Sequence, residues 1–118
     1  MAVARHRFEP IPLATIQAYV AEIVAMFHPQ KVLLFGSYAY ESPRKGSDVD
    51  LLVLMEHEAE SWSKAAEIRL ALKSPFPLDL IVLSPDRFAA MCAEGSSFAE
   101  NVMEDAVVLY DANHSPTH

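Results

Sequence analysis

Hydrophobic residues recur along the chain in short blocks whose spacing changes from helical to extended. The first block has the 3.6-residue period of an amphipathic helix. Thr15 is a candidate cap for this helix, and Pro29 stops it because proline cannot continue a helical ladder. The apolar face of the predicted helix consists of Ile16, Val20, Ile23, Val24 and Phe27.

The next two blocks are continuous apolar runs of strand length. Val32–Phe35 ends at Gly36 and Ser37, which predicts a buried strand that enters a tight turn. A polar segment follows, and Val49–Met55 is the second run. We expect the two runs to be neighbouring strands of one sheet.

The second half of the chain repeats this alternation. An acidic stretch, 56–60, precedes a helix predicted over about 61–73, in which we expect Trp62 to belong to the core. Leu78–Leu83 is apolar on both faces, which is typical of a strand inside a covered sheet.

The remaining predicted elements are a helix that Ser84 caps and Gly95 ends, a helix capped by Ser96 or Ser97, and an edge-proximal strand over 106–110. The pattern as a whole predicts one α/β domain, a four-stranded sheet flanked by helices. We divide it into an N-terminal arm (1–12), a domain (13–111) and a flexible tail (112–118).

Composition narrows the classes of protein that the chain can represent. A chain of 118 residues, 52% of them apolar, suffices for one ordinary core. The net charge of −7 disfavours extended binding to nucleic acid. Cys92 is the single cysteine, and no apolar run is long enough to span a membrane. We therefore expect a cytoplasmic protein without membrane contact.

Three aspartates stand in or beside the predicted strands. Asp48 and Asp50 are two residues apart, so in a strand they project to the same face, and Asp79 lies within the third strand. Carboxylates this close repel one another unless a cation lies between them or one is protonated. Oxygen ligands alone favour Mg²⁺ or Mn²⁺, ions that bridge proteins to substrate phosphates. Gly36 and Ser37 can offer backbone N–H groups and a hydroxyl to such phosphates.

The spacing of these residues resembles a known family. The chain resembles the nucleotidyltransferase superfamily of DNA polymerase beta in one motif, which consists of Gly36-Ser37, ten intervening residues, Asp48-x-Asp50 and the later strand aspartate. Because the chain is short, it is most similar to the minimal nucleotidyltransferases (MNT) of that superfamily. Val32–Ala39 also matches the strand-and-turn phrase of that family, and a weaker likeness extends through 106–110.

The resemblance implies a polymerase-beta-like fold and a specific reaction. Two Mg²⁺ ions, or Mn²⁺, would be held by Asp48, Asp50 and Asp79, and a hydroxyl would attack the α-phosphate of ATP while pyrophosphate leaves. Asp79 would lie nearest the attacking hydroxyl and help to take its proton. Gly36 and Ser37 would bind the nucleotide. Family members often carry Arg-Gly after the turn, where this chain has Tyr40-Glu41; Arg44 and Lys45 are the cations that could replace that arginine.

The resemblance also implies a partner. Many minimal members are antitoxins of a HEPN-domain toxin, and some transfer AMP to a tyrosine of that toxin, so we expect a hetero-oligomer. The alternative is a catalytically weak antitoxin that neutralises its partner by binding alone. An aspartate-nucleophile phosphatase or response regulator is disfavoured, because Asp48 and Asp50 precede their apolar strand, whereas those proteins place the aspartate at a strand's end.

Overall fold

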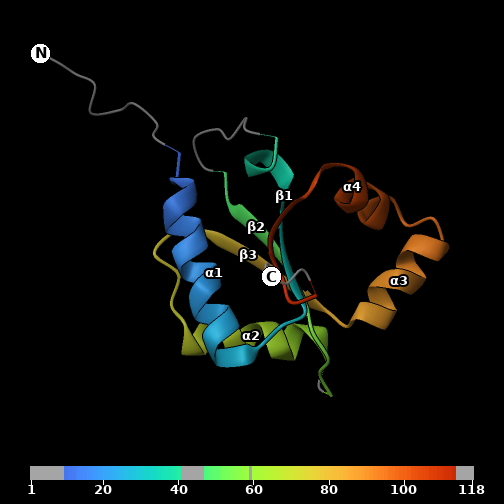
Figure 1. Cartoon of the computed structure of the whole chain (residues 1–118), viewed down its shortest axis with the longest axis horizontal. Coiled ribbons are helices and arrows are strands. Elements are labelled where there is room, and N and C mark those ends of the chain that lie inside the picture. The colour runs from blue at the N-terminus through green and yellow to red at the C-terminus, as the bar shows by residue number, and fades with distance from the viewer. Residues whose placement is uncertain (1–9, 41–46, 59, 114–118) are drawn as a thin grey trace, which may run out of the picture.

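The structure is a computed structural model that describes residues 10–40, 47–58 and 60–113. Within these ranges the helices are α1 (Leu13–Phe27), η2 (Gly36–Tyr38, a 3₁₀ turn), α2 (Ser61–Ala71), α3 (Pro85–Ala93) and α4 (Ser97–Asp105). The strands are β1 (Lys31–Phe35), β2 (Val49–Leu54), β3 (Leu78–Leu83) and β4 (Val107–Asp111). Figure 1 shows one sheet with α1 and α2 on one side and α3 and α4 on the other.

The four strands form a single mixed sheet in the order β3-β2-β1-β4. β1 is antiparallel to both β2 and β4, whereas β2 and β3 are parallel. The sheet confirms the predicted α/β class, the pairing of the first two strands and the edge position of the last. The expectation that Leu78–Leu83 lies inside the sheet is wrong, because β3 is the other edge strand. The sequence of β3 is nevertheless apolar on both faces because helices cover both faces of the sheet.

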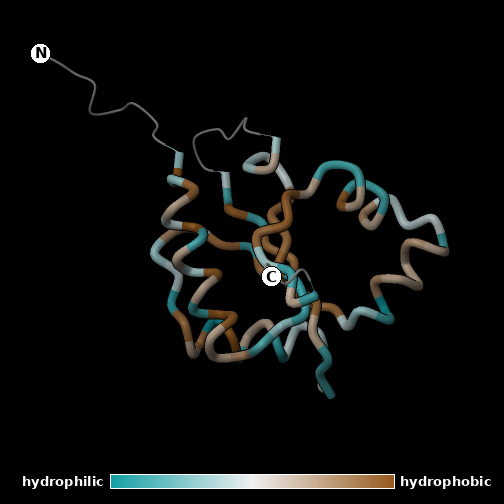
Figure 2. The backbone as a smooth tube through the Cα atoms, in the orientation of Figure 1, coloured by the Kyte–Doolittle hydropathy of each residue, from teal (hydrophilic) through white to brown (hydrophobic). Residues whose placement is uncertain are grey.

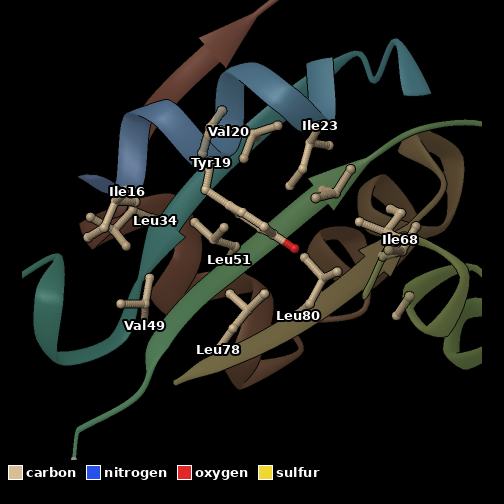
Figure 3. Close-up of a cluster of buried hydrophobic side chains, with 14 of the residues drawn as sticks. Ile16, Tyr19, Val20, Ile23, Leu34, Val49, Leu51, Ile68, Leu78 and Leu80 are labelled. Atoms are coloured by element: carbon tan, nitrogen blue, oxygen red, sulfur yellow. The ribbon is translucent and has the colours of Figure 1, made fainter. Parts of the chain in front are cut away.

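The larger part of the core lies between the sheet and helices α1 and α2. Figure 3 shows side chains of α1 pointing onto the strands. Tyr19 of α1 crosses this core, and its hydroxyl donates a hydrogen bond to the Leu72 carbonyl oxygen at 2.7 Å. This bond fixes the end of α2 to α1. Core residues on this face include Ile16, Tyr19, Val20, Ile23, Val32, Leu34, Val49, Leu51, Val53, Ile68, Leu78, Leu80 and Val82.

A smaller core lies between the opposite face and helices α3 and α4. Both helices begin at the predicted serine caps. Ser84 accepts a hydrogen bond from the Arg87 amide, and Ser96, rather than Ser97, accepts one from the Ala99 amide. The core residues are Leu33, Leu52, Leu54, Phe88, Ala99 and Val102. In Figure 2 the hydrophobic colour is concentrated in the central strands, between these two layers.

Several helix boundaries differ from the prediction. α1 begins after Pro12, so Thr15 lies within the helix and is not its cap. The helix ends at Phe27, where His28 adopts the left-handed conformation just before Pro29. α2 ends at Ala71, two residues earlier than predicted. Residues 1–9 of the predicted arm and 114–118 of the predicted tail lie outside the described ranges.

α2 also departs from the prediction in the residues that it exposes. Trp62 was expected in the core, yet 74% of its surface is accessible, and Leu70 is 81% exposed. The buried positions of α2 are Ala65 and Ile68, so the helix carries apolar side chains on opposite sides. In the part of the chain that the structure describes, no helix combines the length and the apolar character needed to cross a membrane.

Candidate functional site

Asp50 and Asp79 are direct partners across the parallel pair of strands β2 and β3. Side chains alternate along a strand, and the neighbours of both aspartates belong to the core under α1 and α2: Val49 and Leu51 beside one, Leu78 and Leu80 beside the other. Both carboxylates therefore project to the face that carries α3 and α4. The second and third predicted strands thus lie side by side, which is the condition for Asp79 to join the aspartates of the second strand.

The environment of Asp50 disfavours its negative charge. Partial burial, followed by the negative charges of Asp79 and Asp48, raises the pKa of Asp50 to about 6. A hydrogen bond between the Asp50 and Asp79 side chains adds to this effect, because it favours the protonated Asp50 that can donate it. The pair thus concentrates negative charge at one point of the sheet, which a proton or a cation stabilises.

Asp48 contributes to this charge but does not complete a ligand set. It lies immediately before β2 and is exposed, whereas Asp50 is half-buried. Across residues 10–40, 47–58 and 60–113, no group of three His, Cys, Asp or Glu side chains is placed to hold a metal ion. The structure therefore brings together two of the three predicted ligands and leaves the third nearby.

The turn after β1 lies directly against this pair. Phe35, the last residue of β1, is the register partner of Asp50, and Gly36 follows it with a φ of +75°. A Cβ at Gly36 would collide with the Asp50 carboxylate, so both the positive φ and the close approach require glycine. The Gly36 carbonyl accepts hydrogen bonds from the Ala39 and Tyr40 amides at 3.0 and 3.3 Å, which closes the η2 turn around the half-buried Ser37.

A pocket of about 210 Å³ opens between this turn and α4. The Tyr40 hydroxyl donates a hydrogen bond to the Asp105 carboxylate at 2.8 Å and so joins the turn to the end of α4. Phe35 and Phe98 meet edge to face, with their ring centroids 5.4 Å apart. The walls are formed by Phe35, Gly36, Tyr40, Phe98, Asn101, Val102 and Asp105.

Sequence reasoning missed the α4 side of this pocket. Tyr40 and Asp105 are 65 residues apart, and no motif links them. Ser96 predicted the start of α4, but no sequence feature predicted that α4 packs beside the Gly36–Tyr38 turn. The two predicted cations, Arg44 and Lys45, lie in the segment 41–46, outside the described residues.

Comparison with known proteins identifies the family. Residues 16–109 match the model of the nucleotidyltransferase domain, so the chain belongs to that family. The comparison of this chain with curated proteins found no match.

Solved structures share the fold. A protein from Sulfolobus solfataricus, described as a candidate nucleotidyltransferase, superimposes with a TM-score of 0.60 at 19% identity, over 86% of this chain and 82% of that one. A toxin–antitoxin structure with AMP-PNP gives a TM-score of 0.53 at 21% identity, over 80% and 73%. A variant of the toxin–antitoxin pair MntA–HpeT gives 0.52 at 19% identity, over the same shares. At these identities the likeness establishes the nucleotidyltransferase fold.

Proposed function

We propose that the protein transfers AMP from ATP to a hydroxyl group, a tyrosine of a HEPN-domain toxin, and thereby acts as an antitoxin of the MNT type. The observation that carries this proposal is the alignment of Asp50 with Asp79 beside Gly36. A nucleotidyltransferase needs a concentrated negative charge next to a turn that admits phosphates, and these three residues provide both.

The residues fit divalent cations. The site offers carboxylate oxygens. Partial burial, and then the negative charges of Asp79 and Asp48, raise the pKa of Asp50, so a bound Mg²⁺ or Mn²⁺ would stabilise its charged form. Asp50 and Asp79 would hold two ions together with Asp48, whose exposed side chain is free of core packing and can turn toward them. When bound, the ions neutralise the phosphates and favour both attack by the acceptor oxygen and departure of pyrophosphate.

The remaining roles fall to residues of the turn and the pocket. Gly36 brings the backbone close to the phosphates, and the amide and hydroxyl of Ser37 donate hydrogen bonds to them. Arg44 and Lys45 supply positive charge from the segment that follows. Asp79 would lie nearest the acceptor, as the family resemblance implies, and its exposed carboxylate is accessible to accept the proton of the acceptor hydroxyl.

The pocket beside the turn suits the nucleobase. Its volume of about 210 Å³ is below the roughly 300–1,000 Å³ of sites that enclose a whole drug-sized ligand, and its aromatic walls favour a flat ring. The phosphates would then extend from this pocket along Gly36 toward Asp50. Residues 13–111 form the catalytic domain in this proposal.

A toxin partner is supported by the fold neighbours. Two of the similar structures described above are toxin–antitoxin structures, one of them with AMP-PNP. The acceptor would come from that partner in a cytoplasmic hetero-oligomer.

Labelled ATP tests the reaction. With Mg²⁺ and a HEPN-domain toxin as the candidate partner, label in the α-phosphate should pass to the toxin, whereas label in the γ-phosphate should not. Asp50→Asn should abolish the transfer, and Glu22→Gln, an exposed acid on the opposite side of the sheet, should not affect it. Absence of α-label from the toxin with every nucleotide and metal would refute the proposal.

A second candidate, neutralisation by binding alone, is favoured by one observation. Asp48, Asp50 and Asp79 do not converge as a complete ligand set among the described residues. A double variant Asp50→Asn/Asp79→Asn separates the two functions. If it still neutralises the toxin at the wild-type dose, binding is sufficient.

A further inference from the structure

The exposed side of α2 carries an apolar stripe that the proposed function does not use. Among the large apolar side chains that the structure describes, Leu70 and Trp62 are the two most exposed, at 81% and 74%. They are eight residues apart, and the exposed Ala66 lies midway between them. Because residues four apart are neighbours on one helical face, these three form a continuous line two turns long.

The stripe is symmetrical about its smallest member. Trp62 and Leu70 each lie about 6 Å along the helix axis from Ala66, since a helix rises 1.5 Å per residue. If a second α2 packs antiparallel with the two Ala66 residues at the crossing point, Trp62 meets the partner's Leu70 on both sides. The small side chain of Ala66 lets two helices approach to the usual 8–10 Å.

The charged residues that flank α2 have opposite signs at its two ends. Glu58 and Glu60 precede the helix, whereas Lys73 follows it, and all three are exposed. In the antiparallel arrangement the acidic end of one copy lies opposite the partner's Lys73. A parallel arrangement would instead place Glu60 against the partner's Glu60. The pattern is therefore complementary to itself in one orientation only.

We propose that this stripe is a two-fold interface between two copies of this chain, with α2 packed antiparallel against α2. Covering Trp62 and Leu70 in both copies removes on the order of 600 Å² of apolar surface from water. Such a contact belongs to the small interfaces, below about 1,200 Å² in total, so the dimer forms at high protein concentration and dissociates on dilution.

The interface leaves the candidate nucleotide site open. α2 covers one face of the sheet, and Asp50 and Asp79 project from the other, which carries α3 and α4 (Figure 1). The dimer would thus present two sites that point away from each other. The inference rests on the surface of α2 alone and holds whether or not the chain transfers nucleotides.

Trp62 reports directly on this interface, because it is the only tryptophan in the chain. Sedimentation velocity across a dilution series should show a monomer–dimer equilibrium. The Trp62 emission should shift to shorter wavelength as the dimer forms, since the ring leaves water. A wild-type chain that stays monomeric up to the highest soluble concentration would overturn the proposal.

Two variants of matched exposure locate the interface. Leu70→Glu should raise the dimer dissociation constant by about a hundredfold or more, because each dimer loses two buried leucines. Met103→Glu, at a 67% exposed position of α4, should leave dimerisation unchanged. Circular dichroism verifies that both variants fold. A dimer that persists in Leu70→Glu, or that Met103→Glu also abolishes, would contradict the assigned surface.

Charge variants test the antiparallel orientation. In the antiparallel pair, Lys73→Glu places an acidic residue opposite the acidic end of the other copy. The double variant Glu58→Lys/Glu60→Lys places lysines opposite Lys73 of the other copy. Each variant alone should therefore be monomeric. Mixed together, they should form a heterodimer. Failure of the mixture to associate would exclude the antiparallel geometry.

Discussion

Gly36 and Asp50 are in such close contact that no side chain fits between them. Any Cβ at Gly36 would meet the Asp50 carboxylate, and the backbone there already has a φ of +75°. The turn that begins at Gly36 and the carboxylate of Asp50 are therefore one structural unit, although 13 residues separate Gly36 from Asp50 in the sequence. This contact explains physically why the motif requires glycine before its serine.

Gly36→Ala should damage both stability and nucleotide binding. The positive φ strains alanine by about 1–3 kcal/mol, and the methyl group displaces Asp50. Gly95→Ala is a matched control, because Gly95 also has a positive φ, +78°, but its nearest neighbour, Glu100, is 4.0 Å from the added Cβ. Thermal unfolding should show a loss in both variants, and nucleotide titration a loss in Gly36→Ala alone. Equal nucleotide affinity in the two variants would contradict the role given to this contact.

The stability of the metal-free protein should depend on the protonation of Asp50. Its pKa is raised in the folded state to about 6, from an unfolded value near 4, so the folded protein binds the proton more tightly. Acidification from neutral pH through about pH 6 toward pH 4 thus stabilises the fold through this group, and the benefit is lost as the pH rises through 6.

Asp50→Asn isolates this contribution. In EDTA, the melting temperature of the variant should exceed that of the wild type near neutral pH, and the difference should shrink at about pH 5, where the wild-type carboxyl is largely protonated. Differential scanning calorimetry of both proteins at the two pH values measures this. A difference that is independent of pH would mean that Asp50 is not the titrating group.

The hydrogen bond between Tyr40 and Asp105 should affect the pocket more than the fold. Both residues are exposed, so Tyr40→Phe should change the melting temperature little. Loss of the bond frees the turn from α4, and we expect a several-fold higher KM for ATP with kcat nearly unchanged. Tyr110→Phe on β4, outside the pocket, is the control. An unchanged KM in Tyr40→Phe would show that this bond does not shape the nucleotide site.

Local sequence signals predicted most of the fold. The 3.6-residue period of α1, the two apolar runs of β1 and β2, and the serine caps of α3 and α4 depend on neighbours within a few residues, which a sequence displays directly. The proximity of Asp50 and Asp79 could be stated only as a condition, because it requires the second and third strands to be neighbours, and the order of strands in a sheet is not a local signal.

The incorrect predictions concern contacts between elements that are distant in the sequence, which local sequence patterns do not determine. β3 is an edge strand although it is apolar on both faces, since helices cover a sheet's edge strands as well as its centre. Trp62 is exposed because α2 turns Ala65 and Ile68 inward instead. The pocket wall that contains Asn101 and Asp105 depends on how α4 packs, and no sequence spacing encodes that packing.

The most direct test of the account is calorimetric titration of this chain with a non-hydrolysable ATP analogue, in the presence and absence of Mg²⁺. The wild type and Glu22→Gln should bind the analogue only with the metal, and Asp50→Asn and Asp79→Asn should lose at least about tenfold in affinity, or about 1.4 kcal/mol. Metal-independent binding, or binding that is unchanged in both aspartate variants, would contradict the assignment of the nucleotide site to the Asp50–Asp79 pair.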